Sequence, residues 1–429
     1  MNTLKVGICG LGTVGSGTVN VLQRNAATIS ARAGVNIEIV HVGARRDNPL
    51  CDITPYKVSR DIFDVVRDPN VDLVIELIGG TTIAKDLVTE AINNGKHVVT
   101  ANKALIALYG NDLLALAAEK GVTVAFEAAV AGGIPIIKAV REGVAANEIK
   151  WLAGIINGTG NFILTEMRDK GRDFADVLAE AQALGYAEAD PTFDVEGIDA
   201  AHKLVILASL AFGMPFRFEK CFTEGISSID ALDVKFAEEL GYRIKHLGIA
   251  RRCENGIELR VHPTLIPEKR LIANVNGVMN AVLVNGDASG PTLYYGAGAG
   301  ADATASAVIA DVVDIARGNQ IPMMGFAPDE VSKQRILPIE EVETAFYLRI
   351  SAEDKPGVLS EIATALSVRG ISIEAIIQKE AHDDEVRVPI IILTNRTVES
   401  KMIDAISTIE KFDFVQRPVV RVRVESLAG

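Results

Sequence analysis

The stretch from Gly185 to Lys203 gathers several carboxylates and one amine, the groups that could hold a polar substrate. If Asp199 opens a helix, Lys203 lies one turn later on the same face, so its ammonium and the carboxylate point at one spot. The apolar run that follows predicts a buried helix. Taken by itself, the pattern is better explained by an ordinary salt bridge between residues four apart. The acids are Glu188, Asp190, Asp194, Glu196 and Asp199.

A glycine motif near the N-terminus changes that balance. Gly10-x-Gly12-x-x-Gly15 lies between an apolar strand and an amphipathic helical pattern that runs to about Ala33. This is the context of a dinucleotide-binding turn, in which the first glycine makes the turn, the second lets the backbone approach pyrophosphate and the third allows close helix packing. The helix N-terminus would then face the phosphates. A glycine-rich turn without a ligand is the alternative.

The next predicted strand ends in Ala44-Arg45-Arg46, without the acid that would bind a ribose 2′-hydroxyl. Two guanidinium groups suit a 2′-phosphate. The pair therefore predicts that NADP(H) is accepted and preferred, with NAD(H) as the second possibility. Two ordinary solvated arginines are the alternative.

Composition argues against several classes of partner. A net charge of −13 disfavours nucleic acid and anionic membrane as main partners. No apolar run is long enough to span a membrane, and the chain starts directly with a strand, so a soluble cytoplasmic protein is expected. The four cysteines lie far apart without a C-x-x-C pair, which indicates neither a disulfide framework nor a zinc site.

Repeated strand and helix patterns over residues 1–134 predict an α/β fold with a doubly wound, Rossmann-type parallel sheet. Ligands of such sheets lie at the carboxyl ends of the strands. Gly79, Thr100 and Lys103 follow strands in this way, so we expect them to face the cofactor. For Lys103 the alternative is a solvated lysine in a first helical turn, although a cation is electrostatically unfavourable there.

The remaining chain divides into three further parts. Residues 135–295 mix helices and alternating strands, which predicts an α+β domain for substrate binding, catalysis and dimerisation. The loop Gly296–Gly300 precedes a helix of small apolar residues, so 296–318 are expected to return to the dinucleotide-binding domain, unless the loop is a hinge. Residues 319–343 read as a linker. Residues 344–429 read as a ferredoxin-like β-α-β-β-α-β unit suited to regulation or assembly.

These pieces resemble one family, bacterial homoserine dehydrogenase with a C-terminal ACT domain. The family's acidic pattern is matched from Ala181 to Lys203, T-A-N-K is matched at Thr100–Lys103, and the ACT motif is matched at Asp354–Ala363. The resemblance covers essentially the whole chain. It implies NAD(P)-dependent interconversion of L-homoserine and L-aspartate 4-semialdehyde on the branch to threonine and methionine.

The resemblance also implies roles for single residues. Lys203 would give a proton to the nascent alkoxide, Glu188 and Asp199 would hold the ammonium and hydroxyl ends of the substrate, Asp194 would support them, and Lys103 would lie near both substrate and cofactor. Cofactor positions are matched by Thr13, Val14, Arg45, Lys103, Gly185 and Gly300. A monovalent cation, Na⁺, would be held by Glu127, Val130, Gly132 and Ile134, although Glu127 could instead be a capping acid.

The ACT segment is expected to bind threonine near Asp354 and Gly357, at an interface between two such domains of a homodimer or homotetramer, and so to lower activity. A purely structural domain is the alternative. Two positions depart from the family pattern, Gly160 and Ala303, where threonine and proline are usual. They bear on substrate affinity and cofactor preference.

Two other functions compete with this interpretation. A noncatalytic sensor could combine a cofactor-binding fold with an amino-acid-binding ACT domain, but a sensor has no need for Glu188, Asp199 and Lys203 together. An NADP-dependent dehydrogenase of another amino or hydroxy acid is the second alternative. Substrate specificity of the purified protein separates these possibilities.

Overall fold

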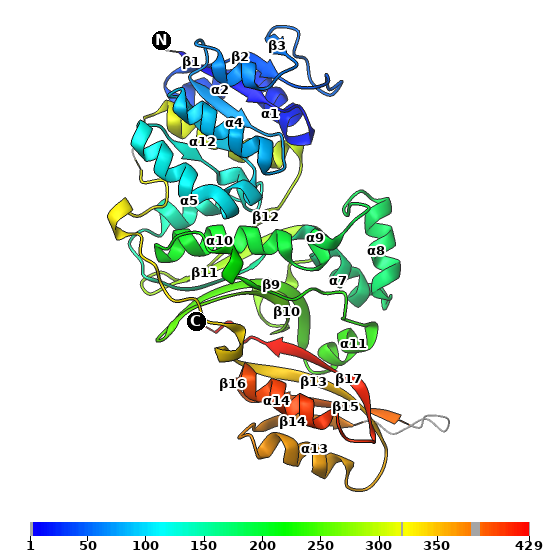
Figure 1. The fold of residues 1–429 in the computed structure, drawn as a ribbon. Coiled ribbons are helices and arrows are strands. Elements are labelled where there is room, and N and C mark those ends of the chain that lie inside the picture. Colours follow the sequence, from blue (N-terminus) through cyan, green and yellow to red (C-terminus); the bar gives the residue numbers. More distant parts are fainter. Residues whose placement is uncertain (1–2, 319–320, 379–386, 429) are drawn as a thin grey trace. The chain divides into compact units, whose positions relative to one another are not determined.

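The computed structural model describes residues 3–318, 321–378 and 387–428 (Figure 1). The chain forms two compact units. The first unit comprises Met1–Gly158, Asp199–Cys221 and Val278–Gln334. The second unit comprises Thr159–Ile198, Phe222–Gly277 and Arg335–Gly429.

A parallel six-stranded sheet organises the first unit, in the order β3-β2-β1-β4-β5-β6. This is the order of a classical dinucleotide-binding sheet, so the predicted Rossmann-type fold is confirmed. The strands are β1 (Thr3–Cys9), β2 (Asn36–Gly43), β3 (Lys57–Ser59), β4 (Leu73–Glu76), β5 (His97–Thr100) and β6 (Val124–Ala125). Their helices are α1 (Thr13–Arg24), α2 (Ala26–Ala33), α3 (Phe63–Arg67), α4 (Thr82–Asn93) and α5 (Lys103–Lys120).

The prediction of one helical segment running to about Ala33 is wrong in one respect, because the segment forms two helices. Asn25 has a non-helical backbone (φ −109°, ψ 14°), although its N–H still bonds to Val21. Asparagine is a weak helix former, since its side chain competes for backbone hydrogen bonds. Gly34 then ends α2 in the left-handed conformation at φ 77°.

Helix α12 (Ala301–Ala316) packs on the Rossmann-type core although it lies far along the chain. Its Ala305, Val308 and Val312 are fully buried in the same hydrophobic cluster as the strands β1 and β4. A side chain at Gly17 of α1 would come within 2.7 Å of the Ala301 carbonyl oxygen, so this glycine allows the two helices to touch.

The first unit also contains an antiparallel group of strands and the long helix α10. The strands pair in the order β7-β11-β12. These elements are α6 (Ile136–Lys138), β7 (Ile149–Ile155), α10 (Ile198–Phe212), β11 (Met279–Gly286) and β12 (Gly290–Ala297). Thirteen of the fifteen residues of α10 are buried, as its apolar sequence predicted.

The second unit is built on a sheet in the order β9-β10-β17-β13-β15-β14. The last four strands and the helices α13 and α14 form the expected ferredoxin-like unit, which is confirmed. The strands are β8 (Phe222–Thr223), β9 (Tyr242–Cys253), β10 (Gly256–Pro267), β13 (Glu343–Glu353), β14 (Ile373–Gln378), β15 (Arg387–Thr394), β16 (Thr397–Val398) and β17 (Val415–Val424). The helices are α7 (Gly158–Lys170), α8 (Phe174–Ala183), α9 (Thr192–Val195), α11 (Ala231–Glu239), α13 (Val358–Ser367) and α14 (Glu399–Ile409).

Strand β17 joins the ferredoxin-like unit to the strands that precede it. It pairs antiparallel with β13 and parallel with β10, where Thr264 lies opposite Arg423. The C-terminal segment therefore continues the same sheet as the β9–β10 hairpin.

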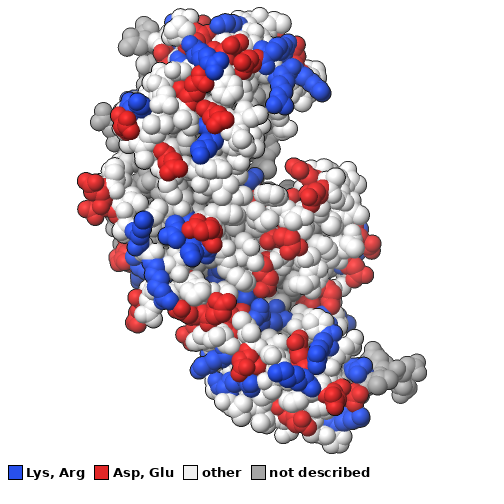
Figure 2. All heavy atoms as spheres, in the orientation of Figure 1, with Lys and Arg blue, Asp and Glu red and all other residues white. Residues whose placement is uncertain are grey.

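None of the helices in the described ranges is long and apolar enough to cross a membrane. Figure 2 shows Lys and Arg interspersed with Asp and Glu on the visible face, without one sign of charge covering it.

Candidate active site

The glycine turn between β1 and α1 has the geometry that a bound pyrophosphate needs. Gly10 has φ 102°, and a side chain there would meet the Leu77 carbonyl oxygen at 2.6 Å. A side chain at Gly15 would meet the Gly10 carbonyl oxygen at 2.1 Å. A side chain at Gly12, by contrast, would have no atom of the described residues within 4 Å of its Cβ, and Gly12 caps α1 without a side-chain hydrogen bond. The open space beside Gly12 and the backbone N–H groups of Thr13 and Val14 at the start of α1 thus suit a phosphate.

Arg45 and Arg46 follow β2 and are both exposed. In the part of the chain that the structure describes, neither guanidinium has an ion pair within the protein. They lie beyond the carboxyl end of β2, at the edge of the sheet where such folds bind the adenosine of a dinucleotide.

Thr100 supports this edge from inside the sheet, because the residue is fully buried. Its hydroxyl donates to Glu76 Oε2 at 2.6 Å, and the Asn102 N–H donates to the hydroxyl at 2.9 Å. The Thr100 hydroxyl is therefore turned into the protein, and the expectation that this residue faces the cofactor stays a prediction. Glu76, which the sequence did not single out, also bonds to the Ile78 N–H at 2.9 Å and so shapes the loop of Gly79 and Gly80.

Three charged residues meet where α5 begins and α10 begins. Lys103 Nζ lies 2.8 Å from Asp199 Oδ1, and Lys203 Nζ lies 2.6 Å from Asp199 Oδ2. Asp199 and Lys203 are on one face of α10 four residues apart, as their spacing predicted. The Lys203 side chain is 11 % exposed and that of Asp199 is 8 % exposed. This is a nearly buried acid between two amines.

Two contacts that the sequence did not reveal complete this cluster. Asn157 Nδ2 donates to Asp199 Oδ2 at 2.9 Å, and Lys203 donates to the Ile156 carbonyl oxygen at 2.7 Å. Both partners come from the segment directly after β7. Burial would raise the pKa of Asp199, but the ammonium groups of Lys203 and Lys103 outweigh it and hold that pKa below its usual value. Asp199 is therefore ionised and directs the Lys203 ammonium.

His202, next to Lys203 in the sequence, packs in the interior. Its ring stacks on Phe218 with centroids 4.3 Å apart. Burial is the main cause that lowers its pKa to about 4, so the ring is neutral near pH 7.

Glu127 uses its carboxylate to cap α6. The carboxylate accepts hydrogen bonds from the backbone N–H groups of Ile137 at 2.9 Å and Lys138 at 2.7 Å. Burial raises the pKa of Glu127 to about 7. Of the two possibilities for this acid, capping accounts for the side chain, while its backbone oxygen accepts a hydrogen bond from the Val130 N–H at 3.4 Å.

The loop after Glu127 turns sharply toward the second glycine-rich loop. Ala131 and Gly132 have φ 53° and 38°, and a side chain at Gly132 would meet the Gly298 carbonyl oxygen at 2.7 Å. Among the described residues no cluster of three or more His, Cys, Asp or Glu side chains could hold a metal. A cation in this loop would thus rely on backbone oxygens, such as those of Val130, Gly132 and Ile134, which are suitable ligands for a hard cation.

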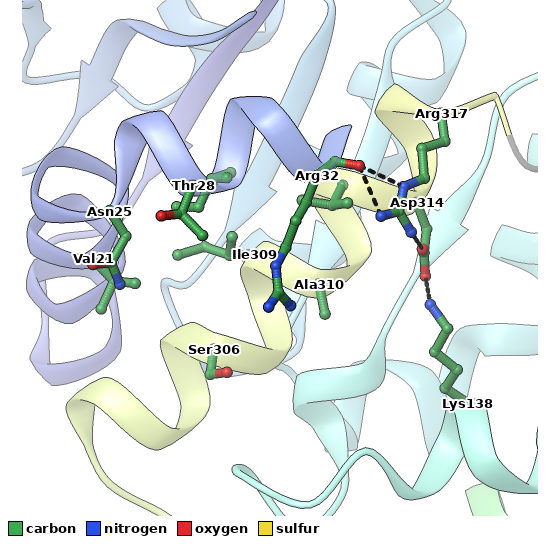
Figure 3. A pocket seen from close by; sticks show the side chains of 12 residues that line it. Val21, Asn25, Thr28, Arg32, Lys138, Ser306, Ile309, Ala310, Asp314 and Arg317 are labelled. Atoms are coloured by element: carbon green, nitrogen blue, oxygen red, sulfur yellow. Dashed lines mark hydrogen bonds and ion pairs between the residues drawn. The ribbon is translucent and has the colours of Figure 1, made fainter. Parts of the chain in front are cut away.

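The far end of α6 is fixed to α12. A pocket of about 420 Å³ is lined by α1, α2 and α12. Figure 3 shows its lining side chains, with the ion pair between Lys138 and Asp314 among them. In the same view Arg317 donates to the Arg32 carbonyl oxygen at 3.0 and 2.8 Å, which caps α2. Lys138 and Arg317 therefore hold these helices together.

The remaining predicted site residues belong to other segments of the chain. Gly185 and Glu188 are exposed on the segment between α8 and α9, and Asp194 is half-buried in α9; all three belong to the second unit. Gly300 is exposed at φ 123° directly before α12. In the ferredoxin-like unit, Asp354 is exposed and accepts a hydrogen bond from Gln378 at 3.3 Å, while Gly357 caps α13 at φ 98°.

Comparison with known proteins identifies the family. Residues 10–127 match the NAD-binding domain of homoserine dehydrogenase, residues 135–313 match homoserine dehydrogenase, and residues 346–411 match the ACT domain. A homoserine dehydrogenase of Pseudomonas aeruginosa is 65 % identical over the full length of both chains. The crystal structure of a homoserine dehydrogenase from Thiobacillus denitrificans is 59 % identical, covers 100 % of this chain and 99 % of its own, and superimposes with a TM-score of 0.94.

A more distant structure is that of a hyperthermophilic archaeal homoserine dehydrogenase in complex with NADPH. It is 26 % identical with a TM-score of 0.62, and the match covers 73 % of this chain and 97 % of that one. Family models and full-length relatives agree, and the chain belongs to the homoserine dehydrogenases, NAD(P)-binding oxidoreductases that act on a CH–OH group.

Proposed function

We propose that this enzyme interconverts L-homoserine and L-aspartate 4-semialdehyde, prefers NADP(H) while tolerating NAD(H), and uses Lys203 as the group that gives and takes the proton. The cluster of Lys103, Asp199 and Lys203 carries this proposal, because it sets a nearly buried amine in a fixed direction within the unit that holds the glycine turn. The bound cofactor supplies or accepts the hydride.

In this proposal Asp199 and the Ile156 carbonyl orient the Lys203 ammonium. The ammonium gives a proton to the aldehyde oxygen as that oxygen becomes an alkoxide, and takes it back in the reverse direction. Asn157 donates to the same Asp199 oxygen as Lys203 and helps to keep the carboxylate in place. Glu188 and Asp199 would hold the ammonium and hydroxyl ends of the substrate, because carboxylates complement a cation and accept hydrogen bonds, and Asp194 would support them.

The test is the loss of NADPH absorbance when purified enzyme meets L-aspartate 4-semialdehyde. Rapid turnover with this aldehyde, and much slower turnover with other amino or hydroxy aldehydes, is expected. Tight NADPH binding without turnover of any aldehyde would favour the sensor, and faster turnover of a different aldehyde would favour the second dehydrogenase.

Replacing Arg45 and Arg46 together with serine is expected to raise KM for NADPH by about tenfold or more while KM for NADH changes by less than about twofold. Hydrogen bonds from the arginines to the charged 2′-phosphate of NADPH contribute roughly 1.5–3 kcal/mol to binding. NADH lacks this phosphate and does not make these hydrogen bonds, so its binding should change little. The measurement is steady-state kinetics with both cofactors. An equal rise for NADH would show that the arginines serve the fold or the adenine instead.

We also propose a monovalent cation, Na⁺, bound by the backbone oxygens of Glu127, Val130, Gly132 and Ile134. The support is the sharply turned loop, together with the Glu127 carboxylate, which is already bound to the backbone of α6.

Within the family pattern, the functional domains would be 1–134 with 296–318, 135–295, the linker 319–343, and the ACT domain 344–429. All four cysteines are free thiols, which is consistent with a cytoplasmic enzyme.

The ACT domain is proposed to bind threonine near Asp354 and Gly357 between subunits of a dimer or tetramer. Saturating threonine is then expected to lower kcat or raise KM for homoserine by about tenfold, a coupling of roughly 1.4 kcal/mol. Steady-state rates with and without threonine measure it. No change in either parameter would leave the domain with a structural role.

A further inference from the structure

The turn from Phe222 to Ser227 contacts both the ACT strands and the end of the acidic loop, and all these residues lie within the second unit. Strand β8 opens the turn and pairs parallel with β10, where Arg260 lies opposite Phe222. The Glu224 N–H then donates to the Val261 carbonyl oxygen at 2.8 Å. Strand β10 thus fixes the backbone of the turn and leaves the Glu224 carboxylate for other partners.

On the ACT side, two arginines of β17 contact that carboxylate. Arg423 donates to Glu224 Oε2 at 3.1 Å, and Arg421 approaches the same oxygen at 3.5 Å. Arg423 is 1 % exposed and also bonds to Glu399 of α14 at 2.7 and 2.9 Å. Burying a guanidinium costs folding free energy unless carboxylates pair with it. Arg423 therefore keeps the carboxylates of Glu224 and Glu399 in fixed positions beside it.

On the other side, the same turn contacts the end of the acidic loop. The Ile226 N–H donates to the Val195 carbonyl oxygen at 2.9 Å, and Ser227 Oγ donates to Glu196 Oε1 at 2.8 Å. A side chain at Gly225 would lie 2.7 Å from the Val195 carbonyl oxygen, so this backbone contact needs glycine. The turn therefore fits closely against the residues that follow Asp194.

A buried histidine links the turn to the next residue of the loop. His246 Nε2 donates to the Glu224 carbonyl oxygen at 3.0 Å. A side chain at Gly197 would meet the His246 ring at 3.1 Å. The ring thus packs between Glu224 and Gly197, two residues before Asp199 in the chain.

We infer that Glu224 is a positioning residue for substrate binding: its ion pair with Arg423 fixes the 222–227 turn, and the turn fixes residues 195–197 at the end of the acidic loop. Glu224 touches neither substrate nor cofactor. Its effect on the substrate rests on the proposed function, in which Glu188 and Asp199 hold the substrate and Asp194 supports them. A ligand of the ACT domain that moves β17 would alter substrate affinity through the same contacts.

The test is Glu224→Gln in the full-length enzyme, which removes the charge and keeps the shape. The side chain is 28 % exposed, so the fold is expected to survive. Losing a charged hydrogen bond of this kind should raise KM for homoserine by about tenfold, with kcat and KM for NADPH within about twofold. Without any substrate, hydrogen exchange of the backbone amides at 194–198 should be about tenfold faster.

Glu425→Gln is the matched control. Its carboxylate pairs with Arg260 at 2.5 Å and Arg251 at 2.8 Å, is only 2 % exposed, and also joins the C-terminal part to β9 and β10. This variant should lower the melting temperature without changing KM or exchange at 194–198. Arg421→Gln, which weakens the longer contact to Glu224, should raise KM for homoserine by less than Glu224→Gln.

Unchanged exchange at 194–198 in Glu224→Gln overturns the inference, and so does an equal change in the Glu425→Gln control, which would show general loosening. The hydrogen-exchange measurement needs no substrate, so it separates the two claims. If the wild type turned over no homoserine but exchange at 194–198 was still faster in Glu224→Gln, the proposed function would be wrong and the positioning role of Glu224 would stand.

Discussion

Lys203→Met is expected to lower kcat by about two to four orders of magnitude, the usual contribution of a general acid or base. Methionine keeps the apolar stem that packs in α10 but carries no proton. Asp199 retains Lys103 at 2.8 Å and Asn157 at 2.9 Å, so the carboxylate is still paired after the change. The measurement is the rate of NADPH oxidation together with a separate titration of NADPH binding, which should stay within about twofold of wild type.

Lys150→Met is a matched control for that experiment. Lys150 lies on β7 in the same unit and is exposed, so the same exchange of lysine for methionine should leave kcat unchanged. If Lys203→Met retained kcat within about tenfold of wild type, the proton would have to come from another group or from water. If NADPH binding were lost as well, the variant would report on the fold and not on the chemistry.

The sequence predicted this pair because helical periodicity is local. Once Asp199 opens a helix, the position of Lys203 follows from the turn length alone. The residue pattern placed Lys103 only at a strand end, and the family resemblance placed it near substrate and cofactor, but its distance from Asp199 depends on how α5 and α10 pack. Asn157 was not predicted at all, because an amide after a strand carries no pattern that distinguishes a buried donor from a solvated side chain.

The same limit applies to the C-terminal half. The ferredoxin-like unit was predicted because each of its strands and helices has a clear apolar period. Strand β9 was not predicted, since Lys245 and His246 lie in its interior and break the alternation of apolar and polar residues. Its partners make these polar residues tolerable: Lys245 Nζ donates to the Val275 carbonyl oxygen at 2.5 Å and to Asn161 at 3.2 Å. The parallel pairing of β10 with β17 joins residues far apart in the chain and leaves no local signal.

The second large effect is expected in the glycine turn, where alanine at Gly15 should reduce folding stability and alanine at Gly12 should reduce cofactor binding. Gly15→Ala is expected to lower the free energy of unfolding of the cofactor-free enzyme by about 3 kcal/mol or more, because a methyl group 2.1 Å from the Gly10 carbonyl oxygen would force α1 away from the turn. Gly12→Ala should cost about 1 kcal/mol or less, the usual effect of alanine at a helix cap, since its surroundings are open.

Thermal unfolding with and without NADPH separates the two variants. Gly12→Ala should melt near the wild-type temperature without cofactor and lose most of the stabilisation that NADPH gives, because the methyl group occupies the space a pyrophosphate needs. Gly15→Ala should melt lower in both conditions. If Gly12→Ala kept the full NADPH stabilisation, the phosphates would have to bind away from the N-terminus of α1, and the cofactor would lie elsewhere on the sheet. If Gly15→Ala melted like wild type, α1 would pack less closely on the Gly10 turn than the structure places it.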